Sequence, residues 1–402
     1  MDKLQNVVQD INENILRKQY NETKEIIDEV AKFIIKKKLL LYGGFALNLL
    51  LPKKDKFYKE YTMNDFDCYS PNAKADAIEL SKILSEKNYK YIKIKHALHE
   101  NTFKIYVNFI QILDITQISK GLYNSFLRLA EAERKTPVYK YYNADFILTP
   151  IAFLKSNLHF ELARPMSSYF RWEKIYRRSL LFDKIMKNVK LPKTSPKTPK
   201  DSNGSIDIDH YKQDIKDVLR YVKTNKLPIV SDYALKFYEI DESKYKKNRN
   251  NYLIILSTNI EKTKNEILQV LKSETTIKVS YVSPDIFPDY YTIQIDDSFN
   301  IIKVVSGNKE CYSYIKKKGF VIGSYDTTLY FLYLEYLINM IDESYDEAKS
   351  VWKTIMCLED FIANTFKQSP EKRLSVDCYG TYHSRRSVLA HKWKKKQTIK
   401  YY

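Results

Sequence analysis

Cysteine and histidine are scarce in this chain, and long apolar runs are absent from it. Four cysteines and six histidines occur among 402 residues, and the cysteines lack the spacing of a zinc site. Only His96 and His99 lie close together, and we expect them to flank a hairpin tip. We therefore expect no zinc site and, as in a cytosolic protein, reduced thiols. No segment approaches the roughly 18 apolar residues of a membrane span, and residues 1–14 are polar and charged, so we expect neither a membrane-spanning nor a secreted protein.

Acidic residues are outnumbered by basic ones. The chain carries 67 Lys and Arg against 49 Asp and Glu, a formal charge of +18. Such an excess favours partners rich in phosphate, and the 34 tyrosines offer flat surfaces on which unpaired bases can stack. An AT-rich genome would also produce many lysines and tyrosines. Composition therefore supports a nucleic-acid partner only modestly.

Three aspartates in two β-like segments have the pattern of a metal site. Asp65 and Asp67 stand two apart around Phe66, so both project from one face of a strand. Asp114 lies in a second β-like segment and joins the same cluster if the two strands are neighbours. Carboxylates are hard oxygen ligands, and three of them at one point would repel one another without a cation. The pattern therefore predicts a divalent metal site.

A glycine pair precedes this cluster. Gly43 and Gly44 follow an apolar strand and precede a short helix, Phe45–Leu50. Without a Cβ atom they let backbone N–H groups approach a triphosphate at the helix N-terminus, which favours anions. Taken alone, a Gly-Gly pair is usually a turn and Asp-x-Asp is common in loops. The ordered combination of strand, Gly-Gly, helix, Asp-x-Asp strand, helix and third-Asp strand favours catalysis.

Apolar spacing and turn residues predict a mixed α/β chain with a linker at residues 190–205. The expected helices are Ile11–Lys36, Ala73–Lys87, Asp145–Leu162 and Ser167–Asn188, and the expected strands are Leu39–Tyr42, Tyr89–Ile94 and Thr102–Ile118, the last long enough to be two.

The pattern before the linker recurs after it without its chemistry. Ser231 and Asp232 stand where Gly-Gly stood, Tyr252 and Ile254 replace the Asp-x-Asp pair, and Lys303 falls opposite the third aspartate. We infer an internal duplication with one active and one degenerate copy.

Gly43-Gly44, Asp65-x-Asp67 and Asp114 together resemble the nucleotidyltransferase superfamily, which includes poly(A) polymerases, CCA-adding enzymes and oligoadenylate synthases. Within it the chain resembles the poly(A) polymerase catalytic subunits of large cytoplasmic DNA viruses, of the mimivirus and African swine fever type. The segments that carry this closer resemblance are 41–46, 65–67, 149–155 and 377–380. One departure is the long interval between Gly44 and Asp65, from which residues 52–62 must loop out.

The resemblance implies a bilobed α/β (α+β) protein with two nucleotidyltransferase-like domains, the second degenerate. We expect a catalytic domain with an N-terminal helix at residues 1–189, a linker or surface loop at 190–205, the degenerate domain at 206–370 and a basic segment at 371–402.

The resemblance also implies template-independent polyadenylation of mRNA in the host cytoplasm, at the viral factory, or by enzyme packaged in the virion. AMP would pass from ATP to the 3′ hydroxyl of single-stranded RNA with two Mg²⁺ or Mn²⁺ ions. Asp65 and Asp67 would hold both ions, and Asp114 would help hold the ion that activates the hydroxyl. Poxvirus relatives work with a processivity partner, whereas the giant-virus type resembles a homodimer, and the sequence does not choose between the two.

Further residues are candidates for contact with the nucleotide or with RNA, the RNA candidates on charge alone. Gly43 and Gly44 would face the nucleotide's phosphates, and Lys155 is a weaker phosphate candidate, since a surface lysine is the simpler explanation. The candidates for contact with the RNA backbone are Arg171, Lys174, Arg177, Arg178, Arg385 and Arg386.

Two other functions fit the same residues. The fold could add CCA, uridylate or oligoadenylate, because spacing does not locate the residues that select the base. A non-catalytic RNA-binding scaffold is the more distant alternative. It would have no need of three mutually repelling aspartates.

Overall fold

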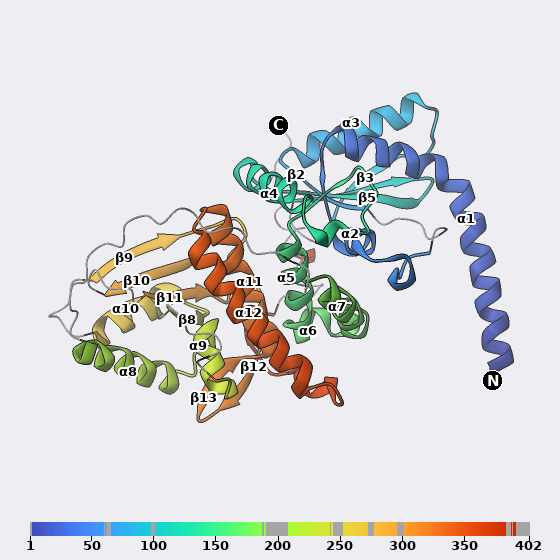
Figure 1. Cartoon of the computed structure of the whole chain (residues 1–402). Coiled ribbons are helices and arrows are strands. Elements are labelled where there is room, and N and C mark those ends of the chain that lie inside the picture. The colour runs from blue at the N-terminus through green and yellow to red at the C-terminus, as the bar shows by residue number, and fades with distance from the viewer. Residues whose placement is uncertain are drawn as a thin grey trace. The chain divides into compact units, whose positions relative to one another are not determined.

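The protein divides into two compact units, each built around its own sheet (Figure 1). The computed structural model describes residues 2–59, 61, 66–97, 101–186, 189, 208–241, 243, 252–271, 277–295, 301–382, 387 and 389–390. Unit 1 comprises residues 1–154 and 180–190, and unit 2 comprises residues 155–179 and 191–402. Residues 155–179, which the sequence places in the catalytic domain, pack within unit 2. The functional extent of each domain stays a prediction.

Unit 1 is a six-stranded mixed sheet with helices packed on it. The strand order is β3-β4-β5-β2-β1-β6. The strands are β1 (Leu40–Tyr42), β2 (Phe66–Ser70), β3 (Lys93–His96), β4 (Thr102–Val107), β5 (Ile110–Gln117) and β6 (Ile147–Leu148), and the helices are α1 (Asp2–Lys36), α2 (Gly43–Leu50), α3 (Ala73–Glu86) and α4 (Lys120–Glu133). Helix α3 packs against β4, β5 and α1. The central strands are buried: Leu40, Phe66 and Ile115 are at most 1% exposed, so the sheet is a rigid base for anything at its edge.

Residues 102–118, expected to be long enough for two strands, form the two strands β4 and β5, which are joined in a hairpin around Asn108 and Phe109. Several other expected elements of unit 1 differ from the observed ones. The strand expected from Tyr89 begins only at Lys93. The helix expected from Asp145 is strand β6 followed by α5 (Ile151–Leu162), because Pro150 disfavours helical backbone in the residue before it. No element was predicted at α4.

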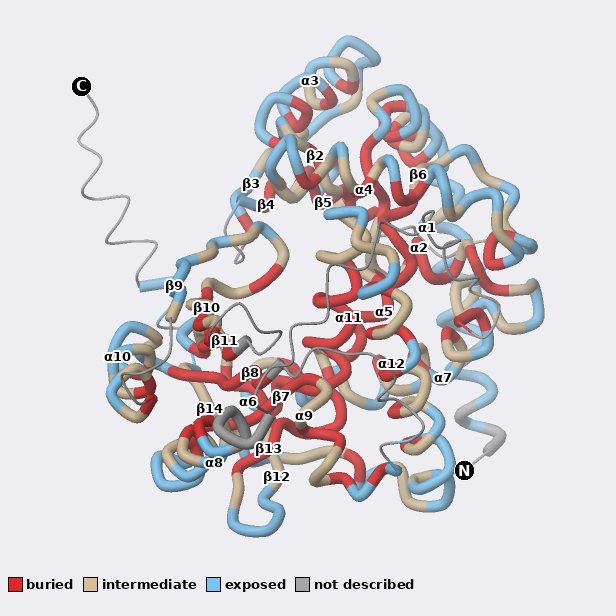
Figure 2. The backbone as a smooth tube through the Cα atoms, turned by 60° about the vertical axis from the view of Figure 1, so that its left-hand side comes forward, coloured by how far each residue is buried: buried red, intermediate tan, exposed pale blue. Residues whose placement is uncertain are grey.

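Unit 2 is an eight-stranded sheet in the order β14-β12-β13-β7-β8-β11-β10-β9. Its strands are β7 (Ile229–Val230), β8 (Tyr252–Ser257), β9 (Ile277–Val282), β10 (Tyr290–Ile295), β11 (Ile301–Ser306), β12 (Cys311–Lys317), β13 (Phe320–Gly323) and β14 (Cys378–Gly380). Its helices are α6 (Pro165–Ser168), α8 (Ile208–Thr224), α9 (Asp232–Leu235), α10 (Ile260–Val270), α11 (Tyr325–Ile341) and α12 (Tyr345–Thr365), and α7 (Trp172–Met186) and α5 each contribute residues to both units. Figure 2 shows α11 in red, as the buried helix of this unit.

Unit 2 repeats the topology of unit 1. Strands β9-β10-β11-β8-β7-β13 correspond in order to β3-β4-β5-β2-β1-β6, and every neighbouring pair has the same parallel or antiparallel sense. The start of the following helix is also repeated: the Asn72 N–H donates to Ser70 Oγ at 2.8 Å, and the Asn259 N–H donates to Ser257 Oγ at 3.0 Å. The duplication predicted from the sequence is confirmed.

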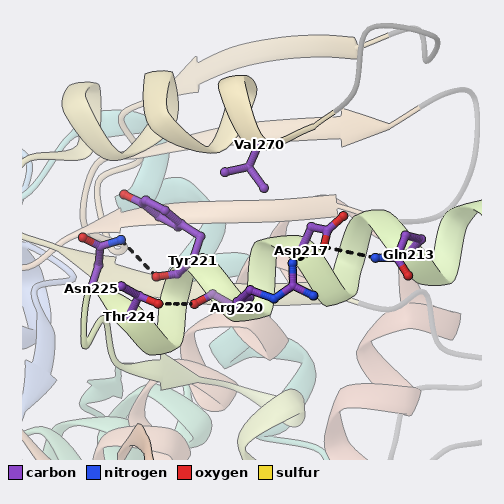
Figure 3. Close-up of a pocket in the computed structure, with 7 residues that line it drawn as sticks. All are labelled: Gln213, Asp217, Arg220, Tyr221, Thr224, Asn225 and Val270. Carbon is purple, nitrogen blue, oxygen red and sulfur yellow. Dashed lines mark hydrogen bonds and ion pairs between the residues drawn. The ribbon is translucent and has the colours of Figure 1, made fainter.

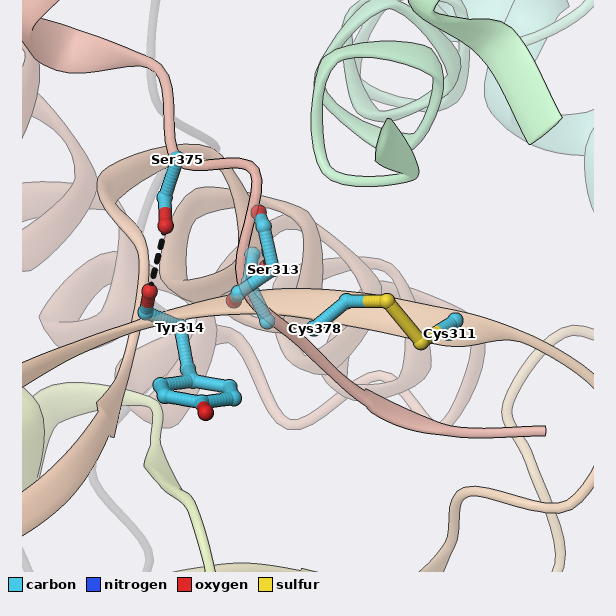
Figure 4. Close-up of a disulfide and its surroundings, with 6 residues drawn as sticks. Cys311, Ser313, Tyr314, Ser375 and Cys378 are labelled. Atoms are coloured by element: carbon cyan, nitrogen blue, oxygen red, sulfur yellow. Dashed lines mark hydrogen bonds between the residues drawn. A yellow bond between two sulfur atoms is a disulfide. The ribbon is translucent and has the colours of Figure 1, made fainter. Parts of the chain in front are cut away.

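The expectation of reduced thiols is wrong for one pair of cysteines. Cys311 and Cys378 form a disulfide, with Cα atoms 5.3 Å apart (Figure 4). The antiparallel pairing of β12 with β14 brings the two residues to adjoining positions, within the Cα separation that disulfides need. Ser375 Oγ donates to the Tyr314 carbonyl at 2.6 Å and holds the segment that enters β14. The bond therefore attaches a C-terminal strand to the sheet of unit 2.

None of the described helices is long and apolar enough to cross a membrane.

Candidate functional site

Strand pairing in unit 1 brings Asp67 and Asp114 side by side. Strand β2 runs parallel to β5, and the two aspartates are partners in its register. Both strands lie in the middle of the sheet, so packing fixes the two carboxylates relative to each other. Asp65 lies outside the described residues. No group of three His, Cys, Asp or Glu side chains gathers among the residues that are described, and the cluster with Asp65 stays a prediction.

Gly43 lies directly against Asp67, one member of this pair. Its φ is +74°, and a Cβ atom added to it would lie 2.5 Å from Asp67 Oδ2. The register agrees, because Tyr42 is the antiparallel partner of Asp67. Only glycine adopts this backbone readily while leaving room for the carboxylate. Helix α2 begins at Gly43, two residues earlier than expected, so the first residue of the helix lies next to Asp67.

Sequence reasoning missed Lys104. It lies on β4 opposite Asp114, forms an ion pair with the Asp114 carboxylate, and donates to Gln111 Oε1 at 3.1 Å. A basic side chain therefore compensates part of the carboxylate charge. Its position opposite Asp114 follows from the register of the β4–β5 hairpin. That register can be predicted only if the turn is known to be at Asn108 and Phe109.

Two other groups beside the carboxylates, the Tyr42 hydroxyl and the Cys68 thiol, stay protonated and neutral. Burial raises the pKa of the Tyr42 hydroxyl well above its usual value, and the nearby Tyr69 and Asp67 raise it further through their charges. Burial likewise raises the pKa of the Cys68 thiol, with smaller contributions from Asp67 and Asp114. The Tyr42 ring stacks on Tyr69 with centroids 4.1 Å apart. The negative charge is thus confined to the carboxylates.

The equivalent position of unit 2 lacks this chemistry. Ile254 and Lys303 are register partners there, as Asp67 and Asp114 are in unit 1. Ser231 has a φ of +70° and keeps the backbone turn of Gly43. An aliphatic side chain and a lysine cannot hold a cation, so the second copy is degenerate at the site.

Lys155 is buried inside unit 2. It is 1% exposed, its Nζ donates to Ser179 Oγ at 3.1 Å, and it lies 3.5 Å from Glu359 Oε1. Burial alone would raise the pKa of Glu359, but the charge of Lys155 and a hydrogen bond from His159 more than offset it and hold the pKa at about 2. The lysine thus stabilises the fold of unit 2. A phosphate contact by Lys155 stays a prediction that its burial does not favour.

The predicted RNA contacts lie on one stretch of unit 2. Lys174 and Arg177 of α7 are exposed, Arg178 is half-buried, and Arg171 precedes the helix. Two of them pair with acids: Arg171 with Glu161 at 3.4 Å and Arg177 with Glu173 at 2.7 Å. Exposed pairs of this kind are weak, so both guanidinium groups could exchange an acid for a phosphate. Arg385 and Arg386 lie outside the described residues, and all these contacts stay predictions.

A hollow of about 590 Å³ between α8 and α10 is a second possible site (Figure 3). Its polar groups bond to one another, as the dashed lines show: Gln213 and Arg220 both donate to Asp217, at 3.1 and 2.8 Å. Tyr221 donates to Glu266 at 2.6 Å. Because these groups already satisfy one another, the hollow offers no reactive group, and the carboxylate pair of unit 1 remains the candidate site.

Known proteins resemble parts of this chain. Residues 28–168 match the family described as poly(A) polymerase catalytic subunit. A protein of African swine fever virus (strain Badajoz 1971 Vero-adapted) that carries this name is 37% identical over 105 residues, 26% of this chain and 22% of that protein. A protein of Acanthamoeba polyphaga mimivirus with the same name is 25% identical over 354 residues, 78% of this chain and 57% of that protein. The chain thus spans only part of the relatives that it matches.

A solved structure shares the whole fold. The crystal structure of the Megavirus polyadenylate synthase superposes with a TM-score of 0.78 at 21% identity, covering 99% of this chain and 83% of that one. The matched region 28–168 contains Gly43, Asp67 and Asp114, the residues that the sheet of unit 1 brings together. Residues 28–168 are therefore similar to the catalytic subunits of poly(A) polymerases, and the chain shares its fold with the Megavirus polyadenylate synthase.

Proposed function

We propose that the protein transfers AMP from ATP to the 3′ hydroxyl of RNA without a template. The observation that carries this proposal is the in-register pair Asp67 and Asp114 against the glycine turn, which the degenerate copy lacks. The family match at residues 28–168 supports polyadenylation over other nucleotide additions.

The carboxylate pair fits divalent metal ions. Asp67 and Asp114 are neighbouring oxygen ligands of like charge, and a lysine already compensates part of that charge. We propose that these two residues, with Asp65, hold two Mg²⁺ or Mn²⁺ ions. Such ions, when bound, lower the pKa of the attacking hydroxyl and stabilise the leaving pyrophosphate.

The protein's own groups hold and orient the substrates. Helix α2 begins at Gly43, beside Asp67, and a helix N-terminus favours phosphate oxygens. Lys104 fixes the rotamer of Asp114 through its ion pair. The basic residues of α7 attract the RNA backbone. Action in the host cytoplasm, and a homodimer or a processivity partner, are proposals that rest on the family resemblance alone.

Extension of a labelled RNA oligonucleotide tests this function. Asp67→Asn and Asp114→Asn should each lower the rate of AMP addition by about 10³-fold or more, because each removes a charged metal ligand at no loss of volume. Asp217→Asn, on helix α8 of unit 2, is the matched control and should extend RNA as the wild type does. Full activity in both site variants would exclude this site.

A further inference from the structure

Two exposed aromatic rings stack at the end of the sheet of unit 1. The Tyr91 and Phe109 rings have centroids 5.0 Å apart and an interplanar angle of 28°. The two residues are 69% and 80% exposed, so neither ring is part of the core. Together they present a flat aromatic surface to solvent, which we call the hairpin-tip pair.

The backbone carries strain to present this pair. Val107 and Ile110 are paired, so Asn108 and Phe109 form a two-residue turn, with φ of 50° and 67°. This is the type I′ geometry, which strongly prefers glycine at its second position. Tyr91 also has a positive φ, of 52°. Bulky residues in this region are genuine outliers, and such strain gathers at functional sites. Because both rings are largely exposed, burial of apolar surface contributes little to stability at either position. The stability of the fold therefore does not explain why aromatic residues stand there.

The hairpin-tip pair lies at the same end of the sheet as the candidate site. Strands β3 and β5 are both antiparallel to β4, and β2 is parallel to β5, so β3, β5 and β2 run the same way. Tyr91 and Phe109 stand just before β3 and β5, and Asp67 is the second residue of β2. Phe109 precedes Asp114 by five residues, on the order of 16 Å along the strand. A bound polymer whose end lies at the carboxylates could therefore reach the hairpin-tip pair with its preceding units.

The charge around the pair favours an anion. Lys90 and Lys93 flank Tyr91 and are exposed, and residues 87–97 contain no Asp or Glu. The Lys90 carbonyl accepts from the Asn108 N–H at 3.3 Å, which holds this basic segment against the turn. Stacking surfaces next to cations are the features that bind single-stranded nucleic acid.

We infer that the hairpin-tip pair binds the RNA substrate upstream of its 3′ end, with an unpaired base stacked on Tyr91 and Phe109 and phosphates beside Lys90 and Lys93. This inference rests on the proposed function for the identity of the polymer. A protein partner on the same rings is the competing occupant.

Phe109→Gly is the decisive variant, because it improves the turn while it removes the ring. Its melting temperature should equal or exceed that of the wild type. Its affinity for a single-stranded RNA oligonucleotide, measured by fluorescence anisotropy with chelator present, should fall by about 5- to 150-fold, as the loss of one base stack predicts. Phe109→Trp should retain affinity. Tyr281→Ala removes a ring of unit 2 that is 54% exposed, and it should bind RNA as the wild type does.

Two further readouts separate the possible outcomes. Lys90→Gln with Lys93→Gln should lower the slope of log affinity against log salt by about 1.4, or 0.7 for each lost phosphate contact. In extension assays Phe109→Gly should raise the KM for RNA and leave kcat unchanged. Wild-type affinity in Phe109→Gly, or a change of oligomeric state without a change in RNA affinity, would overturn the inference. Because binding is measured without catalysis, failure of the proposed reaction would leave this test intact.

Discussion

The side chain opposite Gly43 explains why a glycine stands there. Asp67 Oδ2 occupies the space that a Cβ atom would need, and the φ of +74° disfavours other residues as well. In unit 2 the same turn is made by Ser231, at a φ of +70°, opposite Ile254. The turn therefore survives without glycine. Glycine is needed where the carboxylate must approach the helix N-terminus.

Gly43→Ala should lower the rate of AMP addition by at least tenfold. The added methyl displaces the Asp67 carboxylate from its position, and the backbone strain should lower the free energy of unfolding by about 1–2 kcal/mol. Single-turnover rates and chemical denaturation measure the two effects. Ser231→Gly, the matched change in unit 2, should leave the rate unchanged, and an equal loss of rate in it would contradict this account.

Glu133 gives a second test at the scale of one residue. Its carboxylate accepts from the Ile151 N–H at 2.9 Å, and burial raises its pKa to about 8. The folded state therefore retains a proton that the unfolded state releases near pH 4.5, so this group lowers stability progressively as the pH rises from about 4.5 to about 8. Glu133→Gln should raise the melting temperature at pH 8, and the gain should shrink towards pH 5. A gain independent of pH would contradict the assigned pKa.

At the scale of elements, the two strands of the candidate site could be predicted from the sequence, because Asp67 and Asp114 each lie in a β-like segment. The position of Lys104 opposite Asp114 could not be predicted. It depends on a turn at Asn108 and Phe109, and phenylalanine is not a typical turn residue. The buried position of Lys155 was missed for a related reason, since its partner Glu359 lies far away in the sequence. Long-range pairing also determines the disulfide, whose cysteines are 67 residues apart.

Strand β14 offers a prediction at this scale. Cys378→Ser, or reduction of the bond, should lower the stability of unit 2 by about 4 kcal/mol, the value expected for a loop of this length, and the melting temperature by roughly 10 °C. Thermal denaturation with and without reductant measures it. Cys357→Ser leaves the Cys311–Cys378 bond intact and should respond to reductant as the wild type does. An unchanged melting temperature on reduction would show that β14 is held by pairing alone.

At the scale of the whole molecule, the same topology occurs in both units, but only unit 1 has the paired aspartates. Six strands of each sheet have the same order, and Ile254 pairs with Lys303 as Asp67 pairs with Asp114, so the second copy has the same backbone framework at this position. With Ile254 and Lys303 in place of the aspartates it cannot hold a cation, and its sheet has two strands, β12 and β14, beyond the six that the described parts of both units share. Chemistry is thus expected from unit 1 alone.

The most direct test of this account is extension of a single-stranded RNA oligonucleotide with each of the four nucleoside triphosphates separately, in Mg²⁺, Mn²⁺ or chelator. We predict a ladder with ATP alone, absent in chelator and in Asp67→Asn. Extension with another nucleotide would contradict polyadenylation while leaving the fold and the site in place. No metal-dependent extension with any nucleotide would contradict the central claim that unit 1 is an active nucleotidyltransferase.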